Sequence, residues 1–272
     1  MLRSSNPVLS RQDAFTPAAP QYGQSQYQQS PYGYPQYPGQ PQYAGQAPEG
    51  RMTFDDVVTK TAITMAVLIL SAALAWFALP DTLMLPALIL SGLVGFVVVL
   101  VVSFRRVINP TLVLVYAAIE GIFIGMISKY FEFLYQGIVA QAVLGTFAAA
   151  GVTLAAYKFF NIRVTPKFTK IVLISTIAFA VAMLLNFGLS LAGINLGLRD
   201  GGTGPVSLLA VGVALLGAVL AVLNLVLDFD YIEKGIALGA PARESWRGAF
   251  GLTVTMVWLY IEILRLLSYM RR

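Results

Sequence analysis

The sequence predicts an all-α, polytopic integral membrane protein in which seven transmembrane helices follow a disordered N-terminal tail. Of its 272 residues, 57% are hydrophobic and only 11% are charged, and the mean hydropathy is +0.73. A soluble domain averages about 25% charged residues, so lipid is the expected surroundings for most of this chain. From residue 51 onward the apolar residues gather into seven stretches, each of roughly 20 residues and thus long enough for about 30 Å of hydrocarbon.

Turn and capping residues separate the seven predicted spans. Thr53 and Asp56 fit a capping box that would start the first helix in the cytoplasmic interface. Five prolines fall at or near span ends, where proline is best tolerated: Pro80, Pro86, Pro110, Pro166 and Pro205. The predicted spans are 61–80, 83–104, 110–131, 137–158, 169–194, 206–228 and 248–269.

Residues 1–50 form a separate predicted region, a Gln/Tyr/Pro/Gly-rich cytoplasmic tail, and residues 51–272 form the seven-helix transmembrane domain. The run from Gln21 to Ala47 has no charge and no aliphatic residue larger than alanine, so it cannot bury a core. We do not expect a signal peptide, because no apolar central region precedes Met52. The tail either contacts other low-complexity tails through its tyrosines or is a tolerated extension.

Lysine and arginine residues in the connections predict the orientation in the membrane. Nine of them follow the second, fourth and sixth spans, and two follow the third and fifth. The nine-residue side, with the N-terminus, is therefore expected to be cytoplasmic, and the C-terminus to lie outside. Arg271 and Arg272 depart mildly from this rule. Either they extend to the outer interface, or the seventh span does not cross fully.

The absence of histidine and cysteine excludes most catalytic chemistry. Neither residue occurs, which rules out His-based acid–base catalysis, thiol nucleophiles, disulfides and zinc sites with His or Cys ligands. We expect no enzyme and no resident cofactor. Any bound metal would need oxygen ligands, which favours calcium or magnesium, and any pH response must come from carboxylates. The net charge of +5 follows from membrane topology, and no nucleic acid partner is expected.

The last span carries a carboxylate, Glu262, with Arg265 three residues further on. A charge within a membrane span costs several kcal/mol unless it is paired, hydrated or protonated, so Glu262 is a functional-site hypothesis. The alternative is a structural ion pair between the two residues along one helix. Such a pair would add little net stability compared with apolar residues.

A second acidic residue, Glu120, lies in the third span beside Gly121 and Gly125. The two glycines form a GxxxG step that permits close helix contact. Glu120 either faces a polar cavity or ion path, or it caps a neighbouring backbone or pairs with a structural partner.

Asp228 and Asp230 lie where the sixth span is predicted to meet the cytoplasm. Asn224 shares a helix face with Asp228, whereas Asp230 points elsewhere. Acidic oxygens close together at this end of the span could bind a hard cation or share a proton. The alternative is that they are ordinary acidic residues at a helix end in headgroup water.

At these positions the chain resembles a known family. Leu227-Asp228 followed by Ile232 is similar to its Tyr-Asp-Thr-x-x-Ile motif, and Leu259–Leu264 is similar to its Leu-Tyr-Leu-Asp-Phe-Ile motif. This is the Bax inhibitor-1 family of small seven-helix membrane proteins, and in particular its bacterial branch with a Tyr/Gln/Pro-rich tail. The resemblance covers roughly residues 51–272.

The resemblance implies a fold of six helices around a central seventh. It also implies a pH-sensitive calcium leak channel, or slow cation/proton exchanger, in the bacterial plasma membrane. In that family an acidic pair from spans six and seven shares a proton and gates the pore. Carried onto this chain, the pair is Asp228 and Glu262, with calcium as the ion that they would bind. The partners would be the lipid bilayer, calcium ions and protons.

Three features depart from the family pattern. The second acid is a glutamate, and the two acids stand 34 positions apart, so Asp230 is an alternative partner. The family's basic residue in span two has no counterpart, and Arg265 is the candidate substitute. Two carboxylates brought together cannot both ionise cheaply, so at low pH they would share a proton. At higher pH they would repel each other or bind calcium. The competing hypothesis is a non-transporting regulator that binds other membrane proteins or a membrane protease.

Overall fold

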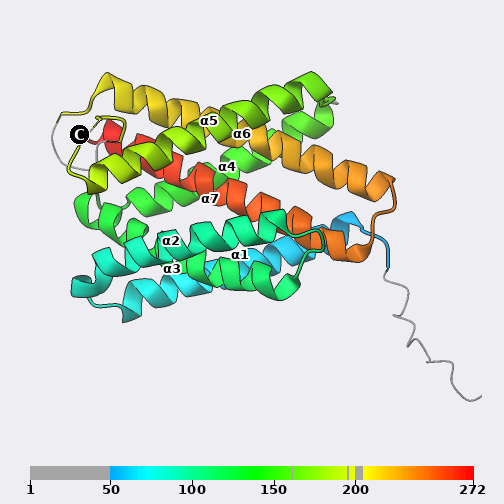
Figure 1. Ribbon diagram of the computed structural model, residues 1–272, viewed down its shortest axis with the longest axis horizontal. Helices are drawn as coiled ribbons and strands as arrows, with labels where there is room; N and C mark the ends of the chain where they lie inside the picture. The colour runs from blue at the N-terminus through cyan, green and yellow to red at the C-terminus, as the bar shows by residue number, and fades with distance from the viewer. Residues whose placement is uncertain (1–49, 161, 195, 200–204) are drawn as a thin grey trace, which may run out of the picture. The chain divides into compact units, whose positions relative to one another are not determined.

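In the part of the chain that the structure describes, seven long helices form in the predicted order, and each is long and apolar enough to cross a membrane (Figure 1). The computed structural model describes residues 50–160, 162–194, 196–199 and 205–272, so residues 1–49 of the predicted tail lie outside the described residues. The helices are α1 (Phe54–Ala78), α2 (Met84–Phe104), α3 (Pro110–Leu134), α4 (Ile138–Phe159), α5 (Pro166–Leu191), α6 (Leu208–Ala237) and α7 (Ser245–Met270), with short 3-10 turns η1 (Asp81–Leu83) and η2 (Ala242–Glu244).

Local capping residues explain where several helices begin. The Thr53 hydroxyl accepts a hydrogen bond from the Asp56 backbone N–H at 3.2 Å, which confirms the predicted cap of α1. Helices α3 and α5 begin with proline, and each follows a residue whose side chain accepts a backbone N–H, Asn109 and Thr165. Proline suits this first helical position because its missing N–H would have no partner there.

Helix α6 is longer than predicted. It continues nine residues beyond the predicted end at 228, through a segment in which Lys234 pairs with Asp230 one turn away at 2.7 Å. Its 30 residues span about 45 Å, more than the roughly 30 Å of hydrocarbon. Asp228 and Asp230 therefore lie inside the helix, about two turns or more before its end, because the helix continues past the predicted apolar span.

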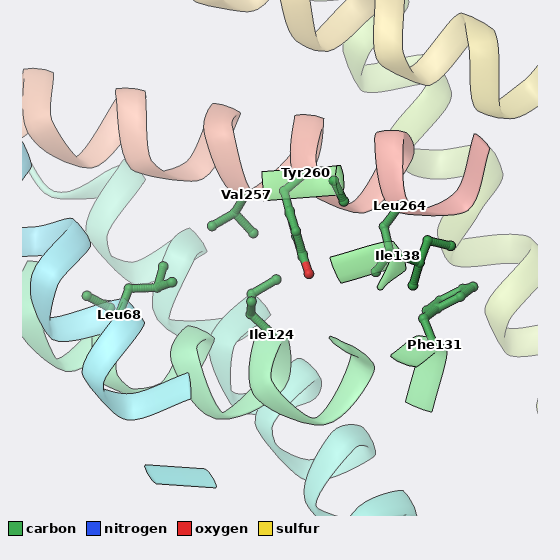
Figure 2. Packing of buried hydrophobic residues seen from close by; sticks show 9 residues of the cluster. Leu68, Ile124, Phe131, Ile138, Val257, Tyr260 and Leu264 are labelled. Atoms are coloured by element: carbon green, nitrogen blue, oxygen red, sulfur yellow. The ribbon is translucent and has the colours of Figure 1, made fainter. Parts of the chain in front are cut away.

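Helix α7 is central, as expected. It packs against α1, α3, α4 and α6, while α2 packs on α3 and α5 packs on α6. Figure 2 shows the apolar cluster around its middle, where a hydrogen bond of 2.7 Å joins the hydroxyls of Tyr260 and Ser128. The labelled residues of the cluster come from α1, α3, α4 and α7: Leu68, Ile124, Phe131, Ile138, Val257, Tyr260 and Leu264.

Helices α1 and α3 approach each other closely at the predicted GxxxG step. A Cβ atom at Gly121 would meet the backbone carbonyl of Leu68, and one at Gly125 would meet that of Ala72. The Ser71 hydroxyl donates to the Ala118 carbonyl across the same contact at 2.5 Å. The two glycines thus serve close helix packing, which confirms the sequence interpretation.

Contacts between connections define the two ends of the bundle. At one end, the Met52 N–H donates to the Ala240 carbonyl at 2.8 Å, and Arg247 donates to the Arg106 carbonyl at 3.0 Å. At the other end, Arg271 donates to the Gln136 carbonyl at 2.7 Å, in the turn between α3 and α4. Helix α7 therefore runs the full length between these two ends of the bundle.

Candidate functional site

The interface between α6 and α7 holds both predicted acids, and each faces a glycine on the other helix. A Cβ atom added at Gly217 of α6 would lie 2.7 Å from Cδ of Glu262. A Cβ atom added at Gly251 of α7 would lie 3.0 Å from Oδ1 of Asp228. Each carboxylate thus occupies space that a larger residue on the facing helix would fill, which lets a polar group lie within a tightly packed interface.

Glu262 is 1% exposed and is bound by an arginine from outside its own helix. Two nitrogens of Arg199 donate to the two carboxylate oxygens, Nη1 to Oε2 and Nη2 to Oε1, both at 2.7 Å. Trp258, one turn earlier in α7, donates its indole N–H to Oε1 at 3.2 Å. This two-point geometry is the strongest form of a carboxylate–arginine contact.

Arg199 lies in the connection between α5 and α6, and its side chain is held by α5. Its Nε donates to Sδ of Met183 at 3.0 Å, and its guanidinium lies 5.6 Å from the ring centre of Phe179. Sequence reasoning counted Arg199 only as a loop charge and missed this contact. The available signal was a single arginine in the α5–α6 connection of a chain with an uncompensated acid in its last span.

Arg265, the predicted partner of Glu262, makes no hydrogen bond to it among the described residues. Its Nε is buried and has no hydrogen-bond partner in the described part of the chain. It still lies within electrostatic range of Glu262 and Arg199. Two guanidiniums therefore surround one carboxylate, and this positive balance disfavours a calcium ion at Glu262 in the present conformation.

Asp228 is half-buried and has a neutral partner. The Thr255 hydroxyl of α7 donates to its Oδ2 at 2.7 Å, and no cation pairs with it among the described residues. Asp230, the alternative partner of Glu262, instead pairs with Lys234 at 2.7 Å. Neither aspartate is an ion-pair partner of Arg199 or contacts Glu262 in the described structure.

The two predicted gating acids are therefore not brought together. Asp228 contacts Thr255, which stands seven residues before Glu262 in α7, a rise of about 10 Å along the helix axis. Within the described residues, no group of three or more acidic side chains could hold a metal ion. A shared proton or a calcium ion bound by both carboxylates would need α6 and α7 to rearrange.

Glu120 faces a different interface. It is half-buried in α3, and a Cβ atom added at Gly95 of α2 would lie 2.9 Å from its Oε2. No hydrogen bond to its carboxylate occurs among the described residues, so the predicted alternative of a structural partner finds no support there. Glu120 is thus a second acid without a cation partner, located on the α2 side of the bundle.

A comparison with protein families places these features in a known context. A family model described as Bax inhibitor 1 like matches residues 6–272, which is nearly the entire sequence. A comparison with curated proteins finds no match.

Proposed function

The chain belongs to the Bax inhibitor-1-like family, and from this premise we propose that it is a pH-sensitive calcium leak channel or slow cation/proton exchanger. Its membrane is the bacterial plasma membrane, with the N-terminus and the Lys/Arg-rich connections in the cytoplasm. The observation that carries the proposal is the pair of carboxylates in the α6–α7 interface, one clamped by arginine and one without a cation. Buried acids within membrane spans commonly mark ion or proton paths.

The two acids have separate roles in this proposal. Asp228 is the pH-sensing group, since its only described partner is the neutral hydroxyl of Thr255. Its charge is present at higher pH, where it attracts calcium, and is lost at lower pH. Glu262 and Arg199 form a latch that keeps the opposite half of the interface closed to cations. Calcium can pass Glu262 only after the guanidinium leaves.

Calcium flux into liposomes that hold the purified full-length protein tests this division of roles. We expect more flux at pH 8 than at pH 6 for the wild type. Asp228→Asn should make the flux independent of pH, because it removes the titrating charge. Glu262→Gln should change the calcium flux at both pH values, because it opens the latch. The ratio of the flux at pH 8 to the flux at pH 6 should stay the same.

Asp230→Asn is the matched control, since it removes the same charge from the same helix two residues away, where Lys234 already pairs with it. It should retain the pH dependence. If Glu120→Gln flattens the pH profile and Asp228→Asn does not, the sensing acid is on α3. If both Asp228→Asn and Glu262→Gln flatten it, the two acids share one proton. Flux no higher than in empty liposomes at either pH would favour the non-transporting regulator.

A further inference from the structure

A lateral seam separates α1 from α4, and two cavities follow each other along it. The cavity near the Lys/Arg-rich end has a volume of about 810 Å³ and is lined by the start of α1, the end of α4 and the later part of α6. The next cavity, of about 330 Å³, lies between later turns of α1 and earlier turns of α4. Because α1 and α4 are antiparallel, the two cavities succeed each other along the same pair of helices, with α7 behind both.

The seam is polar at one end and apolar along the rest. Lys158 and Arg163 lie at the rim of the larger cavity, are exposed, and have no hydrogen-bond or ion-pair partner among the described residues. Glu233 lines the same cavity, where its carboxylate accepts a hydrogen bond from the Tyr157 hydroxyl at 2.5 Å. Two cations and one carboxylate leave a net charge of +1 at this rim.

Apolar side chains cover the walls beyond the rim. Val58 of α1 and Leu154 of α4 line the larger cavity, and both are largely exposed, at 65% and 47%. In the smaller cavity, Leu68 and Ile69 of α1 face Val143 of α4. From Val58 to Leu68 the helix rises about 15 Å, which is half of a hydrocarbon core of about 30 Å. The larger cavity and the beginning of the smaller one thus cover the depth of one membrane leaflet, and the smaller cavity continues beyond it to Phe77.

We propose that this seam binds an anionic phospholipid from the leaflet at the Lys/Arg-rich end. Lys158 and Arg163 hold the phosphodiester, and one acyl chain lies between α1 and α4. The charge balance fits, because a net charge of +1 meets the single negative charge of the phosphodiester. The shape also fits, because only the rim is charged and the walls face hydrocarbon. A soluble phosphate compound would use the rim but leave the apolar walls uncovered.

Native mass spectrometry of the full-length protein in detergent, with added phosphatidylglycerol, tests this site. Lys158→Ala/Arg163→Ala should weaken phosphatidylglycerol binding about tenfold or more, since each basic group near an anionic headgroup contributes severalfold. Lys167→Ala/Lys170→Ala is the matched control. It removes the same charge from the neighbouring segment, and neither lysine lines the cavity. This control should change the binding by less than about threefold.

A second variant tests the acyl chain. Leu154→Trp fills the apolar part of the larger cavity from an exposed position, and it should reduce phosphatidylglycerol binding while thermal unfolding stays at the wild-type temperature. Equal losses in the two double-alanine variants would overturn the site and leave only surface attraction. Equal binding of phosphatidylcholine and phosphatidylglycerol, or full competition by glycerol phosphate, would also overturn it. The inference does not depend on ion flux, so failure of the liposome experiment leaves it standing.

Discussion

Replacing Arg199 with alanine should lower the free energy of unfolding by about 3–5 kcal/mol, because it leaves the buried Glu262 carboxylate without the only cation that hydrogen-bonds to it among the described residues. Both carboxylate oxygens accept from this guanidinium at 2.7 Å, so a single substitution removes two charge-assisted hydrogen bonds. Trp258 alone cannot replace them with one N–H. Thermal or denaturant unfolding of the purified protein in detergent measures the effect.

A double variant separates the ion pair from the general loss of a side chain. Arg199→Ala/Glu262→Gln should recover a large part of the lost stability, because the unpaired charge is gone. Arg243→Ala is the control, since Arg243 is exposed in η2 and has no hydrogen-bond or ion-pair partner among the described residues. Its effect should lie within about 0.5 kcal/mol of zero. If Arg199→Ala behaves like Arg243→Ala, the ion pair does not contribute to the fold in solution.

Replacing Gly125 with leucine should destabilise the bundle by about 1–3 kcal/mol or more, because the new side chain would meet the backbone of Ala72 in α1. A side chain can rotate away from a clash, but a backbone carbonyl cannot, so α1 must move away from α3. The displacement also disturbs the core cluster, to which both helices contribute. Unfolding by an anionic detergent such as dodecyl sulfate measures the loss.

Gly151 in α4 is the matched control position for Gly125, since a Cβ atom there would meet nothing within 4 Å. Gly151→Leu should be close to neutral, because the new side chain points into lipid and leucine favours a helix more than glycine does. If Gly125→Leu and Gly151→Leu unfold alike, α1 and α3 do not meet closely at this step.

The helices could be predicted from the sequence because lipid imposes one dominant rule. A span needs about 20 apolar residues, and the caps at Thr53, Asn109 and Thr165 are set by residues only a few positions away. The end of α6 could not be predicted in the same way. Hydropathy falls at Asp228, but the helix continues as long as its backbone bonds and the Asp230–Lys234 pair support it.

The candidate site was only partly predictable, because pairing across the bundle depends on three-dimensional packing. Local spacing nominated Arg265 as the partner of Glu262, whereas the described structure brings in Arg199, 63 positions earlier in the chain. The acids themselves were recognisable, since a charge within an apolar span stands out. Their separation along α6 and α7 was not recognisable, because a resemblance between motifs does not specify how the two helices are aligned along their length.

The central position of α7 has a consequence for biosynthesis. Chains are made from the N-terminus, so the six outer helices leave the ribosome before the helix that fills their centre. Arg199 is synthesised well before Glu262, which follows it by 63 positions. Until the last 26-residue helix is inserted, the nascent protein lacks both its core and the counter-charge for this arginine. Assembly is thus completed by the final segment of the chain, and a product truncated before residue 245 should be recognised as unfinished and degraded.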